Sequence, residues 1–80
     1  QPQRNLIGNQ IFKLRKSRKL SQKEMVAQLQ VQGYYFSELT ILRIEKGKRL
    51  VTDIELKILC DYFHITPNDL MGYGDNSRMV

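Results

Sequence analysis

The side chains in this sequence that are best able to do chemistry are cations, and most of them lie in the first two thirds of the chain. Residues 1–49 contain 11 Lys or Arg against 3 Asp or Glu, whereas residues 50–80 contain 2 against 5. Seven of the cations precede the first acid, Glu24. Such one-sided positive charge favours a polyanionic partner, because it attracts phosphate groups over a broad surface. A charged face that is simply solvated is the alternative.

Catalytic or metal-binding chemistry has little support in the sequence. Cys60 and His64, the single cysteine and the single histidine, are four residues apart. Two ligands are too few for a structural zinc site, and a Cys–His pair without a third, orienting group makes a poor nucleophile. The sequence also lacks a Gly-rich phosphate-binding loop. We therefore expect Cys60 to be a core residue and His64 to cap a helix end, in a protein that is not an enzyme and uses no metal, cofactor or small-molecule substrate.

The length and the apolar pattern place further bounds on the protein. Eighty residues suffice for one domain with one modest core. No run approaches the roughly 18 apolar residues of a membrane span, and the first residues do not have the pattern of a signal peptide. A single cysteine cannot form an internal disulfide, which fits a reducing cytosol. We expect a cytoplasmic protein that makes no membrane contact.

Four helix starts carry the same signature, a Ser or Thr cap with an apolar residue just before it and another four positions after it. A hydroxyl oxygen at the cap accepts a backbone N–H that would otherwise lack a partner, and the two apolar residues pack together. Glu24 and Glu55 stand three residues past their caps and complete two capping boxes. The four caps are Ser21, Ser37, Thr52 and Thr66.

The sequence predicts an all-α fold of five short helices, with no serious strand pattern. Ile7, Ile11 and Leu14 recur at helical spacing and predict the first helix, which a tight connection at Lys19 and Leu20 follows. We expect Ile54, Ile58, Leu59 and Tyr62 to point inward from the fourth helix. The expected domain covers residues 6–72, and residues 73–80 are expected to form a flexible tail. The five expected helices cover residues 6–18, 21–32, 37–46, 52–63 and 66–71.

Three stretches resemble a known family, the phage-repressor/Cro-type (XRE family) helix-turn-helix domains. Leu20-Ser21-Gln22 followed by Glu24 resembles the start of that family's second helix. Ile44-Glu45-Lys46-Gly47-Lys48-Arg49 resembles the end of its recognition helix and the basic loop after it, and residues 53–70 resemble its last two helices. The resemblance covers roughly residues 7–72. It implies a compact, lambda-repressor-like domain in which helices two and three form the helix-turn-helix.

The sequence departs from the family pattern between these two helices. Ten residues separate Leu29 from Thr40, where the family pattern has about five. We expect the second helix to extend to Gln32 and a wider turn to follow through Gly33, because glycine tolerates the positive φ of a helix end.

The resemblance implies which side chains read bases. In this motif the second helix of the pair enters the major groove and presents its N-terminal part to base edges. Ile41 and Ile44 are expected to face the core. Arg43 has the fork geometry for guanine, although a phosphate contact or a salt bridge is the alternative. The remaining outward residues are the base-reading candidates: Glu38, Leu39, Leu42 and Arg43.

Two of these candidates have a second interpretation that involves no base. Glu38 could accept from cytosine or simply complement the positive end of its helix. Leu39 could contact a thymine methyl group or pack against the turn at Tyr34 and Tyr35.

The resemblance also implies phosphate contacts and one structural ion pair. Arg15 and Glu45 would bridge the first helix to the recognition helix, unless they are unrelated surface charges. Lys13, Lys16 and Arg18 are as well explained by a solvated helix face as by phosphate contact. The candidate phosphate contacts are Gln22, Lys23, Thr40, Lys46, Lys48 and Arg49.

The resemblance, together with the basic charge, implies a transcriptional regulator, a repressor of the Cro type, which we expect to bind double-stranded DNA as a homodimer. The alternative is a protein-interaction module on the same fold, of the antitoxin or anti-repressor type, in which Tyr34, Tyr35 and Phe36 form an interface. RNA binding would need stacking aromatics near the basic patch, for which Tyr34 and Tyr35 are the only candidates.

Overall fold

Four helices begin at the side-chain caps that the sequence predicts. The hydroxyl of Ser21 accepts from the backbone N–H of Glu24, and Ser37, Thr52 and Thr66 each accept from the residue three positions on. In the helices that begin after Ser21 and Thr52, the third-position glutamate also accepts from the backbone N–H of the cap, so both capping boxes are present. Each cap contributes about 1 kcal/mol, and together they fix where the helices start.

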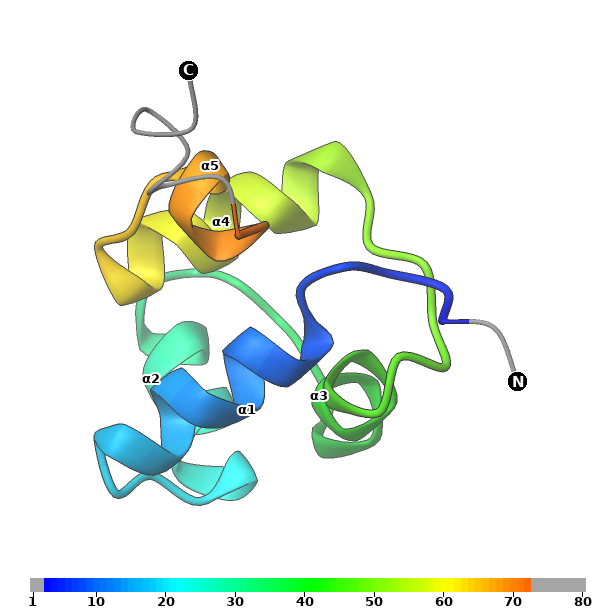
Figure 1. Cartoon of the computed structure of the whole chain (residues 1–80). Helices are drawn as coiled ribbons and strands as arrows, with labels where there is room; N and C mark the ends of the chain where they lie inside the picture. Colours follow the sequence, from blue (N-terminus) through cyan, green and yellow to red (C-terminus); the bar gives the residue numbers. More distant parts are fainter. Residues whose placement is uncertain (1–2, 73–80) are drawn as a thin grey trace.

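The computed structural model describes residues 3–72, and these fold into five helices with no strand among them (Figure 1). The all-α fold class is therefore confirmed. Bounds differ from the expected ranges by at most two residues at either end, mainly because the expected ranges counted cap residues as helix, and the end of α4 at Phe63 is as expected. The expected tail, residues 73–80, lies outside the described residues. The helices are α1 (Gly8–Ser17), α2 (Gln22–Val31), α3 (Glu38–Glu45), α4 (Asp53–Phe63) and α5 (Pro67–Leu70).

The widened connection between α2 and α3 follows the expected course. Helix α2 continues to Val31, Gln32 is its C-terminal cap, and Gly33 has a φ of 94°. The backbone N–H of Tyr34 then donates to the carbonyl of Leu29, which closes the helix end. The connection between α1 and α2 is tight, because Lys19 adopts the left-handed conformation with a φ of 58°.

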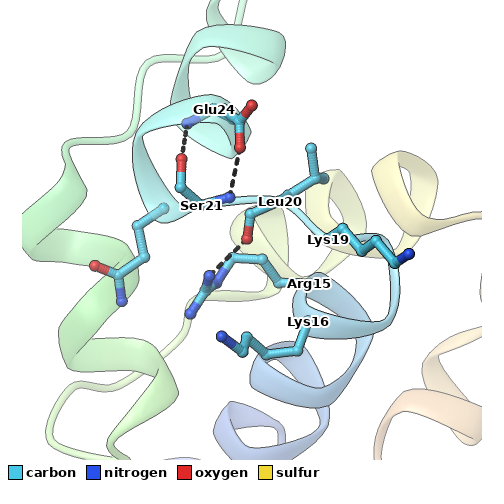
Figure 2. Close-up of a pocket in the computed structure, with 7 residues that line it drawn as sticks. Arg15, Lys16, Lys19, Leu20, Ser21 and Glu24 are labelled. Atoms are coloured by element: carbon cyan, nitrogen blue, oxygen red, sulfur yellow. Dashed lines mark hydrogen bonds between the residues drawn. The ribbon is translucent and has the colours of Figure 1, made fainter.

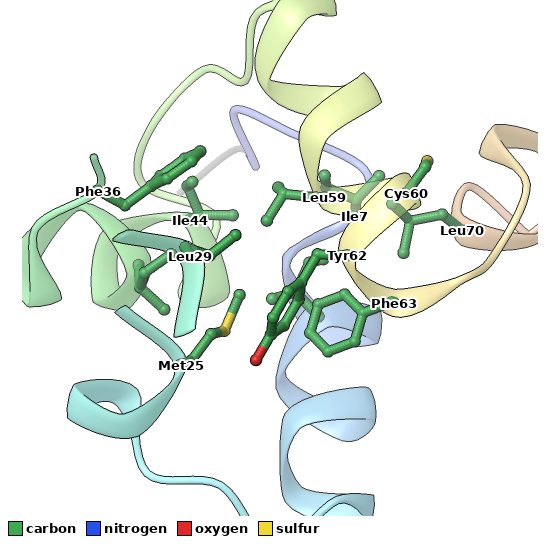
Figure 3. Close-up of a cluster of buried hydrophobic side chains, with 12 residues drawn as sticks. Ile7, Met25, Leu29, Phe36, Ile44, Leu59, Cys60, Tyr62, Phe63 and Leu70 are labelled. Carbon is green, nitrogen blue, oxygen red and sulfur yellow. The ribbon is translucent and has the colours of Figure 1, made fainter. Parts of the chain in front are cut away.

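The core lies between α4 and the packed trio of α1, α2 and α3. Figure 3 shows side chains of α2 and α3 meeting those of α4, with Phe36 of the α2–α3 connection at the edge. Ile41 and Ile44 of α3 are fully buried, as predicted, and so is Leu59 of α4. Cys60 is also buried, which confirms it as a core residue.

The prediction that Ile54 points inward is wrong, because its side chain is 70% exposed. Helix α4 turns Leu59, Tyr62 and Phe63 toward the core. At 100° per residue, Ile54 stands about 140° around the helix from Leu59, which places it on the outer surface. Ile58 is half-buried at the edge of the core.

Polar contacts of two side chains, Arg18 and Tyr62, tie α4 to the first two helices. Arg18 donates to the carbonyl of Phe63 at 2.6 Å and to that of Tyr62 at 3.4 Å, and its guanidinium lies 5.0 Å from the centre of the Phe63 ring. The Tyr62 hydroxyl donates to the side-chain carbonyl of Gln28 in α2. Arg18 therefore caps the C-terminal end of α4, so neither sequence-based interpretation of this residue describes its contacts.

No helix within residues 3–72 is long and apolar enough to cross a membrane.

Candidate nucleic-acid interface

Helix α3 has one buried and one outward face. Ile41 and Ile44 anchor it to α1 and α2, because both side chains are fully buried. Glu38 and Arg43 are exposed on the outer face, and the Leu39 side chain is 51% exposed. Thr40 and Leu42 are half-buried at the margins. Of the four candidate base-reading residues, the structure therefore places three in solvent and Leu42 at the edge.

The first turn of α3 is held by its cap. The Ser37 hydroxyl accepts from the Thr40 backbone N–H at 3.0 Å and lies 2.9 Å from the Thr40 hydroxyl. Thr40 therefore already has a hydroxyl partner inside the chain. Glu38 stands in the same turn, where a carboxylate complements the positive end of the helix.

A buried ion pair sets the position of α3 relative to α1. Arg15 Nε lies 2.6 Å from Glu45 Oε2 and Arg15 Nη2 lies 3.0 Å from Glu45 Oε1, which makes the contact bidentate. The two side chains are 8% and 3% exposed. The hydrogen bond from Arg15 to Glu45 raises the pKa of the guanidinium, so Arg15 carries its positive charge at any ordinary pH. Arg15 also donates to the carbonyl of Leu20 at 2.7 Å (Figure 2), which joins the α1–α2 connection to the same pair.

Gln22 of α2 contacts the same carboxylate. Its side-chain Nε2 donates to Glu45 Oε1 at 3.1 Å, so one of its two amide hydrogens is taken by Glu45. Glu45 thereby receives hydrogen bonds from α1 and from α2, which are the two helices that α3 packs against. Lys23, the neighbouring phosphate candidate, is exposed.

The loop after α3 carries three candidate phosphate contacts, and they differ in their surroundings. Arg49 donates to both carboxylate oxygens of Glu55 at 2.8 Å and to the carbonyl of Leu50 at 2.9 Å. This contact raises the pKa of Arg49 and lowers the pKa of Glu55 below its ordinary range. Lys46 and Lys48 are exposed, and no acid of the described residues forms an ion pair with either.

An open depression of about 640 Å³ lies where α1 ends and α2 begins (Figure 2). Lys16 and Lys19 line it from α1 and the following turn, and Ser21, Gln22 and Glu24 line it from α2. Figure 2 shows Ser21 and Glu24 joined by their capping box, so this end of α2 is already capped.

The structure adds contacts around α3 that sequence reasoning missed. Asn5, just before α1, donates to the carbonyls of Ile44 and Arg49 and so links α1 to the end of α3. Gly8 lets the two helices approach, because a Cβ atom there would lie 2.1 Å from the Ile44 carbonyl oxygen. The one sequence signal that could have drawn attention to Asn5 is a weak one: it is an Asn, a good capping residue, three positions before the glycine that starts α1.

Cys60 and His64 form no site together. Cys60 is buried and burial raises the pKa of its thiol, whereas His64 is exposed at the C-terminal cap of α4 with a φ of 56°. Within residues 3–72 no group of three or more His, Cys, Asp or Glu is placed to hold a metal ion.

Comparison with known proteins gives one result. The family model of the Cro/C1-type HTH DNA-binding domain matches residues 10–76, which is most of the chain. Searches of the curated proteins and of the solved structures returned no match. The matched range contains the second and third helices, the ion pair that joins α1 to α3, and the basic loop. The chain therefore belongs to the family of Cro/C1-type helix-turn-helix DNA-binding domains.

Proposed function

We propose that this protein is a sequence-specific transcriptional regulator, a repressor of the Cro type, that reads the major groove of double-stranded DNA with residues 37–46. The observation that carries the proposal is the presentation of α3. Its inner face is buried, the Arg15–Glu45 pair fixes its angle, and its outer face lies in solvent beside two exposed lysines, Lys46 and Lys48. A helix held in this way fits the groove as a rigid body.

The outer face of α3 supplies the proposed base contacts. Arg43 is exposed and its planar guanidinium matches the O6 and N7 acceptors of guanine. Leu39 and Leu42 offer apolar surface for a thymine methyl group. Glu38 would accept a hydrogen bond from a cytosine amino group. Its negative charge in the first turn of α3 also stabilises the positive end of that helix.

The proposed phosphate contacts surround this face. Lys46, Lys48 and Lys23 have exposed ammonium groups that can reach a duplex backbone. Gln22 would contact phosphate with the amide hydrogen that Glu45 does not take, and Thr40 with its hydroxyl. Arg49 would reach phosphate only by exchanging its bond to Glu55, so we expect it to contribute less than Lys48.

We further propose that the protein acts in the cytoplasm as a homodimer, with residues 6–72 as the folding unit. A lone domain of this size buries a small interface with DNA. Two-fold pairing doubles the contacts and reads a palindrome whose half-sites lie about 34–36 Å apart, one turn of the duplex.

Selection of bound DNA from a random duplex pool tests the function directly. We expect enrichment of a palindrome, and we expect Arg43→Ala to lose that enrichment at one base pair of each half-site. The control is Lys57→Ala, which removes an exposed cation from α4, in another part of the molecule from α3 (Figure 1). A pool that stays random with the unmodified protein would refute a sequence-specific regulator.

A protein-interaction module is the second candidate, because apolar side chains are exposed around the α2–α3 connection. Val31 is 88% exposed, Tyr35 is 80% exposed, and Leu39 follows at the start of α3. Such a patch suits a protein partner. Weak, salt-independent retention of DNA without enrichment would favour this candidate over the regulator, since phosphate contacts make DNA binding fall steeply with salt.

A further inference from the structure

The segment before α1 lies across the loop that leaves α3. We call residues 3–5 the N-terminal strap. The backbone N–H of Arg4 donates to the carbonyl of Gly47 at 2.8 Å, although the two residues are 43 positions apart in the sequence. Figure 1 shows this segment running alongside the α3–α4 loop. The strap therefore contacts the stretch that carries the exposed Lys46 and Lys48.

Asn5 makes four hydrogen bonds that join three parts of the chain. Its side-chain oxygen accepts from the backbone N–H groups of Ile7 at 3.1 Å and Gly8 at 2.7 Å, which caps the start of α1. Its side-chain nitrogen donates to the carbonyl of Ile44 at 3.1 Å and to that of Arg49 at 2.8 Å. The oxygen thus holds α1, and the nitrogen holds the last turn of α3 at Ile44 and the loop after it at Arg49.

Two glycines show how closely the strap and α1 approach this loop. At Gly8 an added Cβ atom would lie 2.1 Å from the Ile44 carbonyl oxygen, and at Gly47 it would lie 1.6 Å from the side-chain oxygen of Gln3. Gly47 also has a φ of 70°, a conformation that favours glycine. The loop is therefore in direct contact with the strap on one side and with α1 at its start.

We infer that the N-terminal strap positions the basic loop for DNA binding and that Asn5 is the positioning residue. This inference rests on the proposed function. Lys46 and Lys48 can contact phosphates in register with the bases read by α3 only if the segment from Ile44 to Arg49 keeps its shape. Because Asn5 binds the carbonyls of both of these residues, it fixes the spacing between the reading face and the cations. Supporting bonds of this kind determine whether a binding site is held closely enough to select its ligand.

The substitution Asn5→Asp tests the donor and the acceptor of the Asn5 side chain separately. Aspartate keeps the oxygen that caps α1 but has no N–H for the Ile44 and Arg49 carbonyls. The matched control is Asn9→Asp, because Asn9 is exposed in α1 and no side-chain hydrogen bond of Asn9 occurs within the described residues. Both variants change the net charge equally, so a difference between them reports the Asn5 site itself, where the donor is lost and a carboxylate oxygen faces the Ile44 and Arg49 carbonyls.

The measurement uses the full 80-residue protein, the palindrome enriched from the random pool, and a random-sequence duplex of equal length. We expect Asn5→Asp to lower the ratio of specific to random affinity by about tenfold relative to Asn9→Asp, with helical content unchanged by circular dichroism. A purely structural role would lower the melting temperature without changing the ratio at a temperature where both variants are folded. Equal ratios for the two variants would overturn the inference.

A second pair of variants decides the matter if Asn5→Asp does not fold. Arg4→Pro and Arg4→Ala lose the same exposed side chain, but only proline lacks the N–H that donates to Gly47. We expect the ratio of specific to random affinity to be about threefold lower for Arg4→Pro than for Arg4→Ala. Identical ratios for the two variants would reject the strap as a positioning element. Failure of the unmodified protein to enrich any sequence would instead count against the proposed function.

Discussion

Replacing Glu45 by glutamine should destabilise the protein by about 3 kcal/mol. The Glu45 carboxylate accepts two hydrogen bonds from Arg15 and one from Gln22, and its side chain is 3% exposed. Glutamine has nearly the same shape but no charge and only one accepting oxygen. The amide NH2 group of the glutamine would face the guanidinium, so one arm of the Arg15 fork would be left without an acceptor inside the protein.

The magnitude follows from the burial of the pair. Removing one partner of a buried ion pair costs about 3–5 kcal/mol, and glutamine retains one acceptor, which places the cost at the lower end. A chain of this size has a free energy of unfolding of about 4–12 kcal/mol. At about 4–8 °C per kcal/mol for a small domain, the melting temperature should fall by about 12–24 °C.

Urea unfolding followed by circular dichroism measures this cost. The control is Asp61→Asn, which breaks the Lys57–Asp61 pair, whose side chains are 78% and 59% exposed. That change should leave the stability almost unaltered, because exposed ion pairs contribute little. If Glu45→Gln cost no more than the control, the reasoning that α3 is held by a buried charge pair would be refuted.

A double-mutant cycle gives an independent check. Arg15→Met alone leaves the Glu45 carboxylate buried without its cation, whereas Arg15→Met with Glu45→Leu replaces both charges by apolar groups. Buried ion pairs exchanged for apolar pairs often lose little stability. We therefore expect the double variant to be at least 1 kcal/mol more stable than the sum of the two single changes. Simple additivity would mean that the two side chains are not coupled.

Four further predictions concern single residues. Arg43→Ala should weaken specific binding by about 1–3 kcal/mol and relax selection at one base pair, and an equal loss on all sequences would exclude base reading. Lys48→Ala should weaken binding to every duplex and flatten the salt dependence of log K by about one, which titrations at several salt concentrations measure. Ser37→Ala should cost about 1 kcal/mol through the lost cap; an unaltered melting midpoint would contradict the start of α3. Because the bonds from Arg49 hold the pKa of Glu55 below its ordinary value of 4.5, the stability that Glu55 contributes is complete well above that pH. This contribution should be lost as the pH falls through the folded-state pKa, so Glu55→Gln should show a shallower loss of stability in acid than the unmodified protein.

The helix starts could be predicted from the sequence because capping is a local interaction. The hydroxyl of Ser37 meets the N–H of Thr40 three residues on, wherever the rest of the chain lies. The spacing of Ile41 and Ile44 likewise predicts which face of α3 is buried, since both residues sit on the same short helix. Residues closer than about one helical turn carry this information in their order alone.

Ile54 shows where local pattern fails. It continues the helical spacing of apolar residues in α4, yet its side chain lies in solvent, because the orientation of α4 is set by where Leu59, Tyr62 and Phe63 meet the other helices. A pattern of apolar residues gives more than one acceptable face, and only packing against a neighbour selects one of them.

The partners of the long polar side chains were also decided by the tertiary structure alone. In sequence Gln22 and Arg49 are candidates for phosphate contact, and Arg18 is as well explained by a solvated helix face. In the fold these three donate to Glu45, Glu55 and Phe63 respectively. Asn5 carries only a weak helix-cap signal in the sequence, and it joins α1 to the end of α3. A hydrogen bond depends on distances of a few tenths of an ångström between segments up to 45 residues apart, which no spacing along the chain encodes. Sequence therefore determined the helices and the family of this protein, and the packing of those helices decided which charged and polar groups remain available to a partner.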